Sequence, residues 1–431
     1  MNLKTCLTIL FATTLLSLGA AVSAQNVDST TQKTTRLTVG GYGEAVFSRH
    51  FYSDNVFRYT HADRYANAPG YSRVDLPHAV IMLGYDFGHG WTMGTEIEFE
   101  HGGVEAAVEK ETEETGEFEQ EVERGGEVAL EQFWVQKSFS KHLNIRAGHI
   151  VVPVGMTNNS HLPTQFFGVY RPEGENTIMP CTWHETGLSV WGRAGAWRYE
   201  VQLLPALNSN LFNDAGWVHG GSASPYEFRP ANSLAGAARV DWTGVPGLRL
   251  SLSGYCGNTF NNDITTTVYS TTSRYYGATG TLMIGTFDFA YHNHWLTLRG
   301  NVDYGHLGDA SLISTRNKNQ TTMTGNPYPH TAVGESAWDA SMEAGIDLLA
   351  WSHTRQHLYL FGRYDHYDSF VPAEGWTDVA WAERQVVSAG INYYPLPQIA
   401  LKAEAGIRML AEQYNNEPYL AVGITWAGYF D

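Results

Sequence analysis

The stretch QIALKAEAGIRML, residues 398 to 410, decides how this chain folds. On a helix, Lys402 and Glu404 would point about 200° apart, and no apolar face would remain to be buried. On a strand, successive side chains point to opposite sides, so the stretch separates into two faces. The apolar face holds Ile399, Leu401, Ala403, Ala405, Ile407 and Met409, and the polar face holds Ala400, Lys402, Glu404, Gly406 and Arg408. The stretch therefore predicts a strand with hydrocarbon on one side and water on the other.

Alternation of this kind, bounded by turn signals, recurs along the whole chain. Every second gap between the alternating stretches is short (GHG, SKH, AGA, GVPG, NH, WSHTRQ and PLP), and the other gaps are longer. Tight turns at one end and long loops at the other are typical of bacterial outer-membrane barrels. The sixteen predicted strands cover residues 36–48, 72–87, 91–101, 127–139, 143–151, 185–193, 197–205, 233–243, 248–258, 278–292, 295–306, 336–350, 357–369, 382–394, 398–410 and 417–428.

The strands of a soluble exported β-sandwich or solenoid would also alternate between apolar and polar residues, but three features favour a membrane barrel. An even strand number returns the chain to the side on which it began, and the final stretch YLAVGITWAGYFD alternates again. Closure satisfies every backbone N–H and C=O inside a bilayer, and sixteen strands enclose an aqueous channel. We predict an all-β fold, a 16-stranded antiparallel transmembrane β-barrel with short periplasmic turns and long extracellular loops. Five tryptophans near the short turns fit an interfacial girdle: Trp91, Trp197, Trp242, Trp295 and Trp351.

The first residues have the layout of a cleaved secretory signal. Lys4 precedes the apolar residues 7–18, and a run of small residues ends at Ala24. We expect a signal peptide over 1–24, a short periplasmic segment over 25–35 and the barrel over 36–431. This arrangement predicts a location in the outer membrane of a Gram-negative cell, in contact with its lipid and lipopolysaccharide. Beyond residue 25, no stretch approaches the ~20 apolar residues that a membrane helix needs.

Charge and cysteine content narrow the function classes further. The net charge of −17 disfavours binding to nucleic acid or another polyanion. Cys181 and Cys256 could form one disulfide at most, and the sequence leaves open whether they meet. No cofactor motif is present, so we expect none to be bound.

The third long loop, residues 152–184, is the most informative connection, with four prolines and a charged cluster. In sixteen-stranded porins the third external loop commonly folds inward and sets the constriction. We therefore expect the loop to sort passing solutes, whereas a surface lid without a part in permeation is the alternative. The residues expected at this constriction are Arg171, Glu173, Glu175, His184 and Glu185.

The same region resembles a known family. LNIRAGHIVVPVG at 143–155, followed by RPEGEN, MP and HETG, is similar to the phosphate-selective porin O and P family of Gram-negative outer membranes. The resemblance is specific over residues 142–193 and architectural elsewhere. It implies a sixteen-stranded, homotrimeric porin with general-diffusion or anion-selective properties. The family's residues carry over as Arg146, Gly148, Pro153, Gly155 and Gly187.

The lumen charges depart from that family, whose members line it with Arg and Lys. Here the fifth loop, 259–277, contains only Arg274 as a basic residue, and the third loop has more acids than bases. We expect a basic column that faces an acidic column across the passage, which would create a transverse field. The basic positions are Arg146, Arg193, Arg249, Arg299, Arg363, Lys402 and Arg408, and the acidic ones are Glu44, Glu96, Glu98, Glu100, Asp303 and Glu404.

The second long loop, residues 102–126, is strongly acidic, with nine Glu against Lys110 and Arg124. Alternation in EFEQEVER predicts a hairpin that projects beyond the barrel. Three roles stay open: a latch over a neighbouring subunit, a collector of divalent cations, which favour carboxylate oxygens, or solubility.

Two other function classes compete with a channel for small hydrophilic solutes. An enzyme at the barrel rim could use His184, Glu185 and Ser189, or His101 and Glu100, but no G-x-S-x-G or H-E-x-x-H motif is present. We therefore expect no enzyme activity. A surface receptor or adhesin is the stronger alternative, because the outer loops are long and rich in Tyr and Trp.

Overall fold

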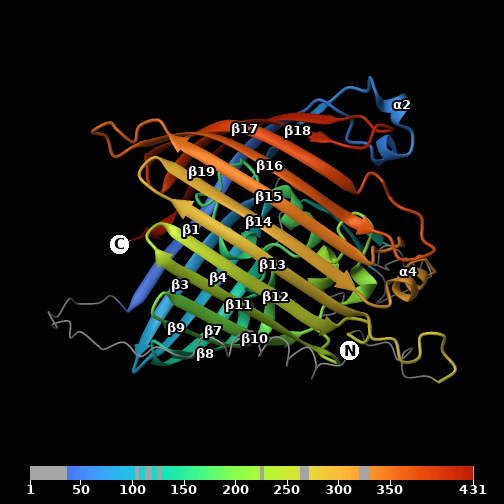
Figure 1. Ribbon diagram of the computed structural model, residues 1–431, viewed down its shortest axis with the longest axis horizontal. Helices are drawn as coiled ribbons and strands as arrows, with labels where there is room; N and C mark the ends of the chain where they lie inside the picture. Colours follow the sequence, from blue (N-terminus) through green and yellow to red (C-terminus); the bar gives the residue numbers. More distant parts are fainter. Residues whose placement is uncertain are drawn as a thin grey trace.

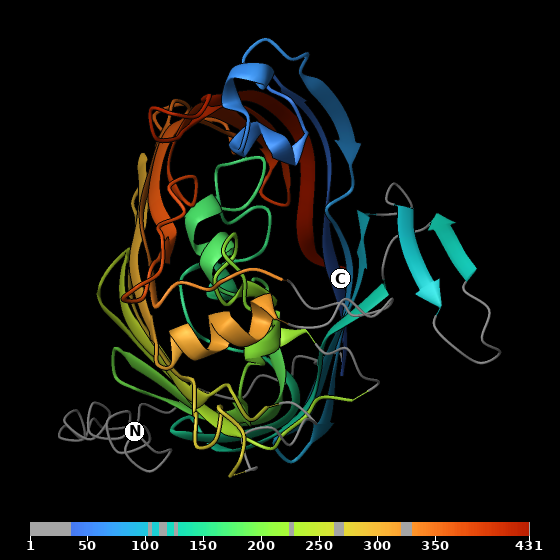
Figure 2. The same cartoon turned by 90° about the vertical axis from the view of Figure 1, so that its right-hand side faces the viewer.

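The computed structural model describes residues 36–101, 106–111, 119–124, 128–223, 228–262, 271–319 and 330–430. The expected signal peptide and the segment 25–35 lie outside these residues, and so do the side chains of the acidic loop. Within the described part, the strands form one closed antiparallel sheet, in which each strand pairs with its sequence neighbours and the last pairs with the first (Figures 1 and 2).

The sheet is a sixteen-stranded barrel, as the sequence predicts. Strands β2 and β3 follow one another along β1 and are separated only by residues 76 and 77. Proline at position 77 has no N–H to donate to the ladder, so one long strand is interrupted there. The barrel strands are β1 (Leu37–His50), β2 (Tyr71–Asp75), β3 (His78–Gly88), β4 (Trp91–Glu100), β7 (Val128–Ser140), β8 (Leu143–Val151), β9 (His184–Ala194), β10 (Trp197–Pro205), β11 (Leu234–Val245), β12 (Leu248–Asn258), β13 (Thr281–His292), β14 (Leu296–Leu307), β15 (Ser336–Asp347), β16 (His357–Val371), β17 (Glu383–Leu396), β18 (Ile399–Met409) and β19 (Glu417–Phe430).

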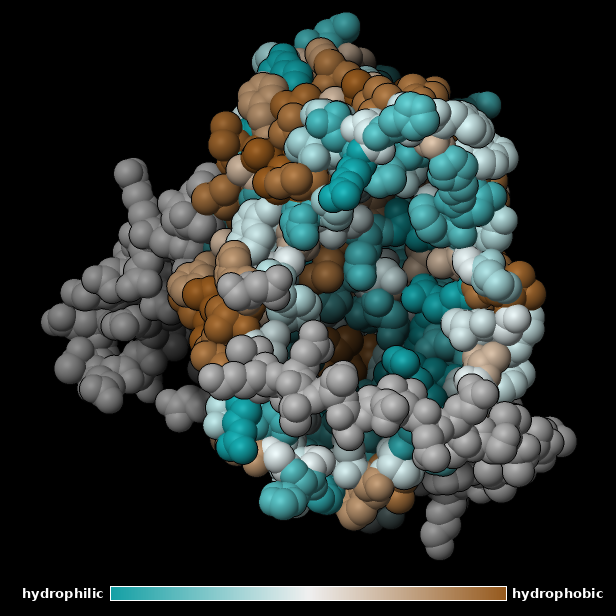
Figure 3. Space-filling model, turned by 90° about the vertical axis from the view of Figure 1, so that its left-hand side faces the viewer, coloured by the Kyte–Doolittle hydropathy of each residue, from teal (hydrophilic) through white to brown (hydrophobic). Residues whose placement is uncertain are grey.

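Strand β18 confirms the two-faced prediction for residues 398–410. Leu401 is 45% exposed on the outer face, whereas Lys402 and Glu404 are only 3% and 5% exposed on the inner face. Hydrophobic residues gather on the outside, and a hollow lined mainly by hydrophilic residues opens at the end with the short turns, which we call the turn end (Figure 3).

Aromatic residues mark the outer surface near the turn end. Trp91, Trp197, Trp295 and Trp351 are all well exposed there. The rings of Trp295 and Trp351 stack with centroids 6.2 Å apart, and Trp197 contacts Trp242. This arrangement matches the girdle expected at a membrane interface. Within the described residues, no helix has both the length and the apolar character needed to cross a membrane.

The acidic loop forms a separate hairpin, as its alternation predicts. Strands β5 (Ala106–Glu111) and β6 (Glu119–Arg124) pair only with each other and lie outside the barrel wall (Figure 2).

Other loops fold into the barrel and fill much of its loop end. A buried apolar cluster there includes Trp183, Phe212, Trp217, Phe260 and Ile313, and all five are at most 2% exposed. Side chains of the wall do not fill the interior, as expected for sixteen strands, and near the loop end the side chains of loops pack into it. The helical segments of these loops and of the rim are η2 (Val56–Tyr59), α2 (Ala62–Tyr65), η4 (Thr157–Asn159), α3 (Glu173–Ile178), η5 (Ser209–Leu211), η6 (His219–Ser222) and α4 (Ala310–Lys318).

Candidate functional site

The third long loop, residues 152–183, lies inside the barrel and is called the inner loop below. Its short helix α3 is enclosed by the ring of strands (Figure 2). Met156, Phe166, Phe167 and Val169 are all at most 6% exposed. The inward position expected for this loop is therefore confirmed.

The base of the inner loop is held by its own buried polar groups. The Glu175 carboxylate, fully buried, accepts hydrogen bonds from the backbone N–H of Met156 (2.5 Å) and of Thr157 (2.6 Å). Burial raises the pKa of Glu175 to about 7, although the contacts with Thr157 and Met156 counteract part of that effect. Asn158 adds a second link, because its Oδ1 accepts from the N–H of Trp183 at 2.7 Å.

The tip of the inner loop is tied to the wall formed by β15, β17 and β18. The Lys402 Nζ donates to the carbonyl oxygens of Phe166 and Gly168, each at 2.8 Å. Asn392 donates to the carbonyl of Phe167 at 2.8 Å, and Glu343 accepts from the N–H of Phe167 at 3.1 Å. These groups fix the loop tip by its backbone.

An ion pair provides another anchor. Arg408 Nε lies 2.6 Å from Glu173 Oε1, and a second nitrogen lies 2.8 Å from Glu173 Oε2, so the contact is bidentate. The Tyr367 hydroxyl also donates to Glu173. Burial alone would raise the pKa of Glu173, but Arg408, with help from Arg384 and Tyr367, lowers it to about 2. The carboxylate is therefore charged at neutral pH.

Arg171 extends from the inner loop toward the opposite, acidic wall. It lies within electrostatic range of Glu44 on β1 and Glu98 on β4. Its Nε and one terminal nitrogen are buried without a hydrogen-bond partner among the described residues. The guanidinium is thus held near carboxylates without being neutralised by a direct contact.

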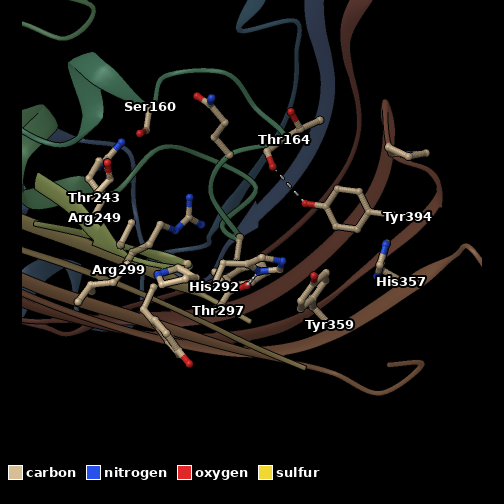
Figure 4. A pocket seen from close by; sticks show the side chains of 18 of the residues that line it. Ser160, Thr164, Thr243, Arg249, His292, Thr297, Arg299, His357, Tyr359 and Tyr394 are labelled. Carbon is tan, nitrogen blue, oxygen red and sulfur yellow. Dashed lines mark hydrogen bonds between the residues drawn. The ribbon is translucent and has the colours of Figure 1, made fainter. Parts of the chain in front are cut away.

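A cavity of about 620 Å³ lies between the inner loop and the turn end of the wall (Figure 4). Arg249, Arg299, His292 and His357 line it, and the described lining residues include no Asp or Glu. Tyr394, whose hydroxyl donates to the Thr164 carbonyl at 3.5 Å, connects the cavity to the loop tip. The arrangement offers several hydrogen-bond donors and aromatic edges to a small solute.

Most predicted basic residues face inward but are paired along the wall. Arg299 pairs with Glu343 on the neighbouring strand, and Arg249 lies 3.3 Å from Asp288. Part of the expected basic column is therefore neutralised where it stands. Among the described residues, inward carboxylates that make no direct contact with Arg or Lys include Glu44 on β1, Glu98 on β4 and Glu131 on β7, and this part of the wall, with β3 between β1 and β4, is called the acidic wall below. Three other inward residues also have polar partners: Arg363 pairs with Asp365 at 3.0 Å, Arg146 donates to Gln136 at 3.2 Å, and Glu185 pairs with Arg229 at 2.8 Å. Glu404 lies beside Arg363. The remaining inward positions on the wall are Glu96, Glu98, Glu100 and Asp303.

Two predicted residues do not reach the passage. His184 lies on the outward side of β9, where it contacts His149, so its expected place at the constriction is wrong. The reason is register: Glu185, one residue later, is the inward one. Arg193 shares the inward side but is exposed at the turn end of β9, away from the inner loop.

Sequence reasoning missed several residues that hold the inner loop. Arg239, 1% exposed, contacts Asp241 at 2.7 Å and Asp288 at 2.8 Å, and it donates to the Gly155 carbonyl at 3.0 Å. Its alternation with apolar neighbours on β11 was a usable signal for an inward position. Asn392 and Tyr367 had no comparable signal. The sequence left open whether Cys181 and Cys256 pair; Cys181 is a free thiol, so the two are not bridged.

Comparisons with known proteins give a consistent picture of the fold. No family model matches the chain. A protein of Aquifex aeolicus without a characterised function is 26% identical over 405 residues, which covers 90% of this chain and 79% of that protein.

Three solved structures are similar to this chain throughout its length. They are an anion-selective porin from Comamonas acidovorans (11% identity, 91% of this chain and 99% of that chain, TM-score 0.52), Salmonella typhi OmpF in complex with daunomycin (12%, 90% and 97%, 0.54) and Pseudomonas putida OprB at high pH (10%, 91% and 94%, 0.51). At these identities the likeness concerns the fold alone. The chain has the closed sixteen-stranded barrel fold of outer-membrane porins.

Proposed function

We propose that this protein is an outer-membrane porin, a channel for the passive diffusion of small hydrophilic solutes or ions that is constricted by residues 152–184. The observation that carries the proposal is the inner loop, which crosses a closed barrel and is fastened to opposite parts of its wall by Lys402, Arg408 and Arg239. A loop held by so many buried contacts defines a fixed opening rather than a mobile cover.

The inner loop packs closely against part of the wall. It contacts the wall at β11, β15 and β18, and a pocket between loop and wall beside Arg363 and Glu343 has a volume of about 10 Å³. A space of that size holds about one water molecule. We infer that solutes pass elsewhere along the loop and that the channel favours small molecules over large ones.

The turn-end cavity would be the place where a solute pauses. Its donors, Arg249, Arg299, His292 and His357, can hydrogen-bond anionic or hydroxyl-rich molecules, and Asp288 and Glu343 offset part of the positive charge of the two arginines. This set of donors agrees with the resemblance to phosphate-selective porins, but the fifth loop has few basic residues. We therefore propose a moderate preference for small anions without strict phosphate selectivity.

The same proposal implies where the protein lies in the cell and how its subunits assemble. The apolar outer face would lie in outer-membrane lipid, with lipopolysaccharide at the loop end, after export by the signal at residues 1–24. A homotrimer is the assembly that the resemblance implies, and the external hairpin β5–β6 would serve as a latch between subunits or as a site for divalent cations on residues 102–126.

Reconstitution into planar bilayers tests this proposal. The purified protein should give ohmic conductance steps, and removal of residues 160–168 from the inner loop should enlarge each step. Ligand binding without conductance would favour a receptor or adhesin, and turnover of a lipid or peptide would favour a rim hydrolase.

A further inference from the structure

Strand register brings carboxylates and an imidazole together on the acidic wall. His78 on β3 pairs with Glu100 on β4, and Val80 pairs with Glu98. Gly43 on β1 pairs with Ala79, so the next inward residue, Glu44, lies beside His78. The inward side chains of three neighbouring strands therefore meet near the loop end. This group, Glu44, His78, Glu98 and Glu100, is called the wall cluster below.

The distances within the wall cluster are short. The ligand atoms of His78, Glu98 and Glu100 all lie within 4.8 Å of one another. His78 Nδ1 lies 2.7 Å from Glu98 Oε1, and His78 Nε2 lies 3.7 Å from Glu44 Oε1. The two imidazole nitrogens thus face carboxylates of different residues: Nδ1 faces Glu98 and Nε2 faces Glu44, while His78, Glu98 and Glu100 form the compact set of donors.

Glu44 gives a second and independent indication. The residue is only 6% exposed, and its Oε2 has no hydrogen-bond partner among the described residues. A buried carboxylate oxygen without a partner is costly unless a proton or a cation accompanies it. Lys402 and Arg171 lie within electrostatic range of Glu44, but neither donates to Oε2, so a cation bound beside His78 would meet this requirement.

The charges around the cluster favour a cation. Asp75, which contacts His101 at 2.8 Å, and Glu131, which accepts from the Tyr42 hydroxyl at 2.8 Å, add acidic groups to the same wall. Several nearby groups oppose a bound cation: Lys402 and Arg171 act on Glu44, and Arg171, His161 and His101 act on His78. Arg171 makes no hydrogen bond to the cluster through its Nε or through one of its terminal nitrogens.

We propose that the wall cluster binds a divalent transition-metal ion, with Zn²⁺ as its representative. Imidazole nitrogen together with carboxylate oxygen is a donor set that Zn²⁺ accepts, whereas Ca²⁺ and Mg²⁺ prefer oxygen ligands alone. The proposal concerns binding, so it holds whether or not the barrel conducts.

Equilibrium dialysis of the full chain in detergent against Zn²⁺, followed by metal analysis, tests the site. Wild type should retain one tightly bound equivalent, and excess Ca²⁺ should not displace it. His78→Gln and Glu100→Gln should each weaken binding. Loss of a residue that merely orients a ligand costs about 10–100-fold in metal affinity, so loss of a ligand should cost at least about tenfold.

Two control variants test whether Zn²⁺ binds at the wall cluster rather than to acidic residues in general. Glu96→Gln changes the same strand, on the same face, outside the cluster, and it should leave Zn²⁺ affinity unchanged. Arg171→Gln should tighten binding, because it removes an opposing charge. Heat-dependent electrophoretic mobility shows whether each variant is folded, and the half-buried Glu100 provides a second ligand variant if His78→Gln does not fold.

Three results would overturn the proposal. The first is wild-type protein without tight Zn²⁺ binding. The second is an equal loss of affinity in Glu96→Gln and in the ligand variants. The third is binding that Ca²⁺ displaces and that His78→Gln leaves unchanged, which would place the ions on the acidic segment 102–126 instead.

Discussion

Lys402 shows how a single side chain acts in this barrel. Its ammonium group, 3% exposed, donates to two carbonyls of the inner loop and lies 4.2 Å from the centre of the Phe166 ring. A hydrogen bond from a charged group contributes about 1.5–3 kcal/mol, so this residue is a main attachment of the loop tip.

Lys402→Met should therefore loosen the loop tip while keeping an unbranched, flexible side chain. We expect larger and noisier single-channel conductance, because the tip would leave the wall for part of the time. The control is Arg193→Met, which removes another inward cation that does not touch the loop. Equal conductance changes in both variants would show that charge, rather than the attachment, is responsible.

The sequence predicted the inward side of Lys402 but not its partners. Alternation is local, so residues 398–410 alone reveal which side chains share a face. The carbonyls of Phe166 and Gly168 are more than 200 residues away along the chain. Backbone oxygens leave no signature in the sequence, and the contact could not be anticipated. For His184, a difference of one residue in strand register was enough to reverse its direction.

At the scale of elements, the inner loop and strand β18 form one coupled unit. Glu173 and Arg408 join them by a bidentate ion pair that is mostly shielded from solvent. The double-mutant cycle of Glu173→Gln and Arg408→Gln should give a coupling energy of about 0.5–3 kcal/mol, as for residues in direct contact. Thermal unfolding followed by electrophoretic mobility measures it, and strictly additive effects would argue against the contact.

The raised pKa of Glu175 predicts that the contribution of this residue to stability depends on pH. Burial raises the pKa of Glu175 to about 7, above the value of about 4.3 in an unfolded chain. Between these values the folded loop keeps a proton that the unfolded chain has lost. The contribution of this group to stability is therefore fully present below about pH 4.3 and is lost as the pH rises through 7.

Glu175→Gln tests this sign, because the amide cannot lose a proton. Relative to wild type, the variant should gain thermal stability as the pH is raised from about 5 to about 8. A stability difference that is the same at both pH values would contradict the assignment.

The elements themselves were largely predictable, and their interruptions were not. Fifteen of the predicted strands correspond to single strands of the barrel, because a strand with one lipid face and one wet face must alternate. The stretch 72–87 is divided at Pro77, and the apolar core of Trp183 and Trp217 comes from residues that the pattern assigned to loops. Packing between loops depends on tertiary contacts that periodicity does not encode.

At the scale of the whole molecule, the arrangement of charge should govern ion selectivity. The acidic wall, with carboxylates on β1, β4 and β7, faces an interior whose turn-end cavity is lined by Arg249 and Arg299. Arg249→Glu should shift the reversal potential in a salt gradient toward cation preference, and Glu96→Lys should shift it toward anion preference. If neither variant shifts it, ions do not pass these residues.

The most direct test of the central claim is the conductance of single molecules of the purified protein in a planar bilayer. A closed barrel crossed by an anchored inner loop predicts small, ohmic, reproducible steps that grow when residues 160–168 are removed. Bilayers that stay electrically silent with the folded protein inserted, before and after that deletion, would contradict it.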